Sequence, residues 1–242
     1  MIIDLGTGKS IAELDFRATH TMLHEQAIYQ HDAEQYQVER LDYENHKAFV
    51  RKVEPDYWTT ALTYRTVGVI EPRAGDTLGR ARIGFGDVKV IEKVTGYKKI
   101  KFFTHENAGY GDVHLPELQM HTTGFWLTVP ESVLASLGAS RATLIDGLRG
   151  LGSALETVST LFLMCDPRDI GQTLGDGGQA GTGDEPAVAP GRDPHAGRTG
   201  GFDPTVFLFD ALPGGVGLAE RIYERAFDLC EAAGRLIRSC SC

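Results

Sequence analysis

The sequence predicts an α+β protein with an antiparallel, barrel-like β-rich part at residues 1–125 and a helical part at residues 126–242. Two observations lead to this fold class. Up to residue 103, short stretches alternate apolar and polar side chains between turn-forming residues, which is typical of antiparallel strands. After Pro130, apolar residues recur every three or four positions, which is typical of amphipathic helices.

The expected strands of the first part are short and are separated by residues that favour turns, such as the linker 42–46. The clearest stretches are residues 36–41, 49–53, 63–70, 85–90 and 99–103. Short strands at this spacing favour a small barrel or a curled sheet.

Two helices are expected in the second part. Apolar residues from Leu144 to Phe162 form one face of the first helix, which Pro167 brings to an end. The second helix follows Gly215 and runs to about Leu236. The segment between them, residues 172–201, is rich in Gly, Asp and Pro, so a surface loop without stable structure is expected there.

The composition is that of an ordinary globular chain, with 42% hydrophobic and 24% charged residues in 242. No apolar stretch is long enough to span a membrane, and the start of the sequence lacks the pattern of a signal peptide. Four cysteines do not suggest a disulfide scaffold, so a cytoplasmic location is expected. The net charge of −9 means that any nucleic-acid binding must be local.

A local basic patch lies between residues 85 and 105, a stretch that contains five lysines and only two acidic residues. Lysines in such a strand contact backbone phosphates, and the neighbouring Tyr97 and Phe103 offer rings that stack on bases. A solvated strand face would carry the same pattern, and the residues alone leave both interpretations open. The candidate nucleic-acid contacts here are Lys93, Tyr97, Lys98, Lys99 and Lys101.

The stretch from Leu212 to Gly217 places Gly214 and Gly215 at the expected start of the second helix. Free amides at a helix N-terminus attract anions such as a DNA phosphate, although a tight entry turn would need the same glycines. Near the N-terminus, the segment 6–10 resembles part of a phosphate-binding loop, but Ile3 stands where that motif needs glycine. A hairpin turn is therefore expected there, and no catalytic constellation is found.

Several blocks of sequence, in this order, resemble one family. They are Ala27–His31 with Gln35–Asp42, Asp56–Thr59, Val94–Lys99, Pro116–Thr123, Cys165–Gly171, Pro213–Glu220 and the final Cys240-Ser241-Cys242. Together they resemble the C-terminal region of superfamily 2 DEAD/DEAH-box DNA helicases related to the mitomycin-repair helicase. Gln26 stands where this family has glycine, and residues 32–34 replace a glycine turn.

The resemblance implies a connector domain over residues 1–125 and a helical zinc-binding domain of the MZB (DUF1998) type over residues 126–242. It also implies that Cys240 and Cys242 are two of four zinc-binding thiolates. The family's other two cysteines follow in a Gly-Cys-x-x-Cys element, which this sequence does not reach, so an incomplete zinc site is expected. Whether Cys165 or Cys230 takes part is left open.

The sequence thus predicts an accessory nucleic-acid-binding region of an ATP-dependent DNA helicase that acts in DNA repair or processing. Its expected partners are DNA, in single-stranded form, and helicase motor domains in cis or in trans, with no membrane. ATP would bind only to those motor domains, which this sequence lacks, so no catalytic activity is expected of the chain alone. The alternative is a protein-docking module that does not bind DNA.

Overall fold

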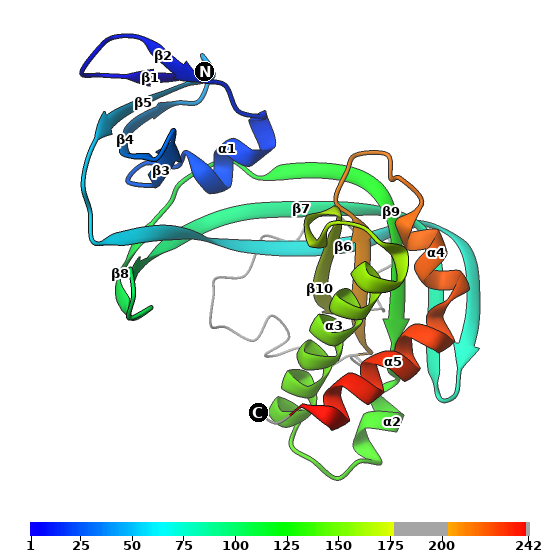
Figure 1. Ribbon diagram of the computed structural model, residues 1–242. Helices are drawn as coiled ribbons and strands as arrows, with labels where there is room; N and C mark the ends of the chain where they lie inside the picture. Colours follow the sequence, from blue (N-terminus) through cyan, green and yellow to red (C-terminus); the bar gives the residue numbers. More distant parts are fainter. Residues whose placement is uncertain (177–202, 241–242) are drawn as a thin grey trace. The chain divides into compact units, whose positions relative to one another are not determined.

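The computed structural model describes residues 1–176 and 203–240 (Figure 1). They fall into two compact units that alternate along the chain, residues 1–64 with 92–118, and residues 65–91 with 119–242. Two long strands, β6 (Tyr57–Leu78) and β7 (Ala81–Lys101), contribute to both units. The division therefore differs from the predicted boundary at residue 125, because strands that share a sheet need not be continuous in sequence.

The first unit contains a five-stranded sheet in the order β2-β1-β5-β4-β3, and this β-rich character confirms the prediction. The pairing of β1 with β5 is parallel, whereas the other neighbours are antiparallel. Ile2, Val38 and Val50 are fully buried at its centre. The strands are β1 (Ile2–Asp4), β2 (Ser10–Ala12), β3 (Ile28–His31), β4 (Glu34–Asp42) and β5 (Lys47–Lys52).

Two turns of this sheet reflect the local sequence. The Asp4 carboxylate accepts hydrogen bonds from the Gly6 amide (2.9 Å) and the Thr7 hydroxyl (2.8 Å), which closes the predicted β1–β2 hairpin. Between β3 and β4, Asp32 (φ 48°) and Ala33 (φ 63°) form a two-residue turn in the left-handed region. Such turns favour glycine, and these are positions where the resembled family carries a glycine turn.

The first unit also contains one helix and a second hairpin. Helix α1 (Phe16–Met22) begins at Asp15, whose side chain accepts hydrogen bonds from the amides of Arg17 and Ala18. Strand β8 (Asn107–Asp112) pairs antiparallel with the end of β7.

The second unit combines a sheet with four helices. Its sheet has the order β10-β11-β9-β7-β6. The new strands are β9 (Leu118–Thr128), β10 (Ile170–Asp176) and β11 (Pro204–Asp210). The helices are α2 (Glu131–Ala135), α3 (Arg141–Leu163), α4 (Leu218–Glu224) and α5 (Ala226–Ser239), and a 3-10 turn spans Pro167–Asp169.

Helix α3 organises the core of this unit. It begins at Ser140, whose hydroxyl accepts a hydrogen bond from the Thr143 amide, and it ends at Met164 in the left-handed conformation. It packs against α5, β10 and β11, and α3 and α5 lie side by side in Figure 1. Leu155, Leu208 and Leu229 are each at most 1% exposed in this core.

The structure corrects three details of the predicted second part. It is not purely helical, because it also contains β10, β11 and the end of β9. Residues 172–176 belong to β10 rather than to a loop, and the rest of the predicted loop lies outside the described residues. The predicted second helix is divided at Arg225 into α4 and α5. No helix within residues 1–176 and 203–240 is both long and apolar enough to cross a membrane.

Candidate nucleic-acid interface

The predicted basic patch lies on a hairpin formed by the end of β7 and by β8, residues 96–112, here called the lysine hairpin. Lys98 pairs with Tyr110 across the two strands, and Lys99 pairs with Gly109. The Lys98 ammonium lies 5.9 Å from the centre of the Tyr110 ring, and that of Lys99 lies 5.0 Å from the Tyr57 ring. Because consecutive strand residues point to opposite faces, the two ammonium groups serve different faces of the hairpin.

The other two predicted lysines differ in their surroundings. Lys101 is exposed at the end of β7, next to the turn of the hairpin. Lys93 lies farther back along the strand and forms an ion pair with Glu117 at 3.6 Å. Lys98, Lys99 and Lys101 therefore lie close in sequence at the end of β7 but on both faces of the hairpin, whereas Lys93 has an ion-pair partner of its own.

The prediction that Tyr97 stacks on a base does not fit the structure. Its side chain is only 6% exposed, and its ring stacks on His24 with 5.0 Å between the ring centres. Gly111 lies opposite, and a Cβ there would come within 2.4 Å of the Tyr97 ring. The tyrosine is thus a packing residue, held between His24 and the backbone of β8.

Phe103 is the most exposed aromatic residue of the hairpin, ahead of Tyr110 at 66%. It lies in the turn, is 98% exposed and has a φ of 69°. Behind it, Trp58 lies 5.5 Å from Phe102 and 5.4 Å from His105, ring centre to ring centre. These rings support the tip of the hairpin, so Phe103 faces water on a supported turn.

The predicted phosphate contact at Gly214 and Gly215 is also corrected. Asp210, which is fully buried, places its carboxylate against the amides at the start of α4. Gly214 and Gly215 donate to the carbonyls of His121 (2.8 Å) and Leu212 (3.1 Å). The carboxylate accepts from the amides of Val216 (2.5 Å), Gly217 (2.8 Å), Leu218 (3.3 Å) and Ala219 (2.8 Å) and from the Thr123 hydroxyl (3.2 Å).

The glycines therefore shape a turn around an internal anion rather than leave amides for an external one. Both have positive φ, 82° at Gly214 and 76° at Gly215. A Cβ on Gly215 would also meet the Thr123 hydroxyl at 2.3 Å. A sequence signal for this arrangement is present, since Asp210 precedes a glycine-rich turn and a helix that lacks a Ser, Thr or Asp cap.

Only one of the two predicted metal ligands lies among the described residues. Cys240 follows α5, and Cys242 lies outside the described residues. Cys165 and Cys230 are free thiols, and burial raises the pKa of Cys230 to about 11, so its thiol is held protonated. No group of three or more His, Cys, Asp or Glu side chains in residues 1–176 and 203–240 is arranged to hold a metal ion. These residues do not by themselves form a zinc site.

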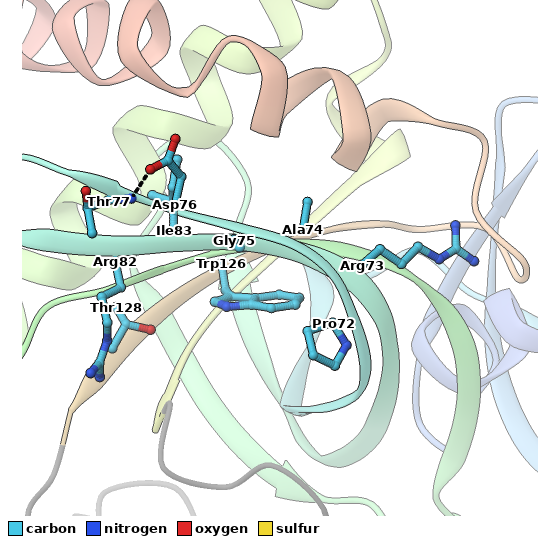
Figure 2. A pocket seen from close by; sticks show the side chains of 11 residues that line it. Pro72, Arg73, Ala74, Gly75, Asp76, Thr77, Arg82, Ile83, Trp126 and Thr128 are labelled. Atoms are coloured by element: carbon cyan, nitrogen blue, oxygen red, sulfur yellow. Dashed lines mark hydrogen bonds between the residues drawn. The ribbon is translucent and has the colours of Figure 1, made fainter.

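The second unit contains a shallow, open cavity of about 800 Å³ that the sequence did not indicate. Figure 2 shows the Trp126 indole in it, with Pro72 on one side and Thr128 and Arg82 on the other. The lining comes from β6, β7 and β9, so residues far apart in sequence meet there.

Comparison with known proteins agrees with this architecture. Residues 151–242 match the family of MrfA Zn-binding domains, MZB. Over 239 residues, the chain is 36% identical to a Bacillus subtilis (strain 168) protein named uncharacterized ATP-dependent helicase YprA. The chain is therefore similar to one part of that helicase. The alignment covers 99% of the chain but 29% of that relative, so the chain spans less than a third of its length.

Solved structures give the same result. A crystal structure of the DUF1998 helicase MrfA bound to DNA aligns with the whole chain at a TM-score of 0.64 and 35% identity. A crystal structure of MrfA itself aligns at a TM-score of 0.61 and 31% identity. In both cases this chain covers 30% of the solved one. The family resemblance predicted from the sequence is confirmed.

Proposed function

We propose that this chain is a DNA-binding region of an ATP-dependent DNA helicase, whose motor domains supply ATP hydrolysis in cis or in trans. The relationship to an ATP-dependent helicase, and to MrfA, which has been crystallised bound to DNA, supports the assignment. DNA repair or processing in the cytoplasm is the setting that we propose for this activity.

The observation that carries the proposal is the lysine hairpin. It carries Lys98, Lys99 and Lys101 near the end of β7 and the exposed ring of Phe103 in the turn that follows. Ammonium groups attract backbone phosphates, and an exposed ring stacks on an unpaired base. A duplex hides the faces of its internal bases, so this combination favours a single strand.

Binding to a labelled oligo(dT) across a salt series, measured by fluorescence anisotropy, tests this function. We expect the affinity to fall with salt, and the triple variant K98E/K99E/K101E to bind more weakly with a flatter dependence on salt. The matched control is K9E/K47E/K89E, which changes the net charge by the same amount away from the hairpin. Equal losses in both triple variants would mean that only the overall charge matters, and would contradict a site on the hairpin.

Zinc is the second part of the proposal. Cys240 and Cys242 supply two thiolates, and a structural zinc site needs four ligands. Residues 151–242 match a family of zinc-binding domains, and this match supports the two cysteines as zinc ligands. In a chain extended past residue 242 by the family's Gly-Cys-x-x-Cys element, we expect zinc content, measured by mass spectrometry, to fall in C240S but not in C230S. Equal zinc content in the extended wild-type chain and its C240S variant would remove the assignment.

A docking module that binds no DNA is the alternative. Exposed apolar side chains on the helical side of the second unit favour it, namely Leu161 (72% exposed), Met164 (93%) and Phe227 (68%). A stable complex with helicase motor domains, together with no DNA affinity even at low salt, would support this alternative and exclude our proposal.

A further inference from the structure

The cavity around Trp126 has the features of a stacking site for a flat ring. Gly84 makes this possible, because a Cβ at that position would lie 2.5 Å from atoms of the indole. One face of the indole therefore lies directly against the backbone of β7 at Gly84. Trp126 itself also lines the cavity. Trp126 further packs against the buried cluster around Val88 and Val90, which fixes its orientation.

Arginine side chains lie at both ends of the cavity. Arg73 donates two hydrogen bonds to Asp87, from Nε (3.0 Å) and Nη2 (2.7 Å). Among the described residues, Arg82 bonds to Asp203 through Nη2, and its side chain is 57% exposed. Arg82 thus keeps donors for another anion, and an exposed ion pair of this kind contributes little and exchanges partners readily.

We propose that this cavity binds one unpaired base of a single-stranded nucleic acid, with the base stacked on Trp126 and a neighbouring phosphate on Arg82. The proposal rests on the proposed function and adds a second contact to it, separate in sequence from the lysine hairpin. A volume of about 800 Å³ is enough for a nucleotide, and the open side lets a continuous strand enter and leave.

The charges of the site predict how this contact behaves. Arg73 and Arg82 are offset by Asp76, Asp87 and Asp203, so the cavity carries no excess of positive charge. Stacking rather than charge must then supply most of the binding. The contact is therefore expected to depend less on salt than the contact of the lysine hairpin.

The two tryptophans of the chain allow the sites to be observed separately. In W58F, the only remaining tryptophan is Trp126. We expect oligo(dT) to quench its emission, and a blunt duplex of the same length to leave it unchanged. The third ligand is thymidine monophosphate. If it quenches at the same concentration as the oligonucleotide, the site takes free nucleotides and the assignment to a strand is overturned.

Substitutions of the exposed Arg82 and the half-buried Asp203 separate recognition from folding. R82Q and D203N both remove the Arg82–Asp203 ion pair, but only R82Q removes the proposed phosphate contact. We expect R82Q to weaken the quenching interaction and D203N to preserve or strengthen it. Equal weakening would assign the pair a structural role only. W126L, with its fold checked by circular dichroism, should lower affinity by about 5- to 150-fold, the range that base stacking gives.

The outcomes distinguish this inference from the function on which it rests. Single-strand binding that needs the hairpin lysines but leaves Trp126 emission unchanged would overturn the inference and retain the function. The absence of single-strand binding at low salt would overturn both.

Discussion

The buried carboxylate of Asp210 gives the sharpest test of how the second unit is built. It accepts hydrogen bonds from four consecutive amides and one hydroxyl, and it joins β11, β9 and the start of α4. The substitution D210A removes every one of these acceptors at once. The turn at Gly214 and Gly215 would then surround a space without an anion.

The cost follows from the donors that lose a partner. The Ala219 amide and the Thr123 hydroxyl are buried, and each unpaired buried donor costs about 1–3 kcal/mol. The lost cap of α4 adds about 1 kcal/mol. Water can reach the amides near Val216, whose residue is 57% exposed. We therefore expect D210A to lower the free energy of unfolding by about 3–7 kcal/mol.

Urea unfolding in the W58F background measures this quantity, because the emission then comes only from Trp126, which lies in the same unit. The matched control is D228A, at the exposed first turn of α5, where the ion pair with Arg225 is 3.7 Å long. That substitution should change the free energy by less than about 0.5 kcal/mol. A D210A effect within about 1 kcal/mol of the control would refute the reasoning.

Three further substitutions test other parts of the fold, each by urea unfolding followed through the tryptophan of the same unit. Burial lowers the pKa of His20 and His24 in the folded chain, so the unfolded state binds more protons below about pH 6.5. The contribution of these two histidines to the free energy of unfolding of the first unit is therefore fully present above pH 6.5. It is lost as the pH drops toward 5.5. In H24Q this fall should be smaller by up to about 1 kcal/mol, and an unchanged pH profile would contradict it. A Cβ on Gly86 would meet the Glu71 carbonyl at 2.1 Å, so G86A should cost about 3 kcal/mol or more, while G68A, with open space around it, should cost under about 1 kcal/mol. A33G should stabilise the β3–β4 turn by about 0.5–1 kcal/mol, because it places glycine at a φ of 63°; a loss of stability would argue against that turn.

The sequence predicts best those helices and strands whose apolar residues recur at a regular spacing. Helix α3 shows its apolar face at three- and four-residue steps, and β4 and β5 alternate, so all three lie close to their predicted positions. Strand β11 was missed because all seven of its residues are buried, which removes any alternation. Strand β10 was missed for another reason, since its glycine-rich stretch owes its extended form to pairing with β11.

The candidate site was predicted in composition more than in geometry. Alternation along β7 indicates a basic strand but does not say which aromatic ring turns inward. That choice depends on Gly111 and His24, which meet Tyr97 only in the folded chain. In the same way, the glycine turn suggests an anion, and only the fold reveals that the anion is Asp210. The sequence around Trp126 does not indicate a binding site, because the space for its indole is provided by Gly84 on another strand.

The interleaving of the two units limits how this chain can be divided or recombined. The polypeptide passes from one unit to the other after residues 64, 91 and 118. A single crossover within this stretch would join parts of both units to foreign sequence, and a stop at residue 125 would shorten β9 and remove all of its partner strand β11. The two units therefore cannot be separated by one cut in the chain, although each has a core of its own.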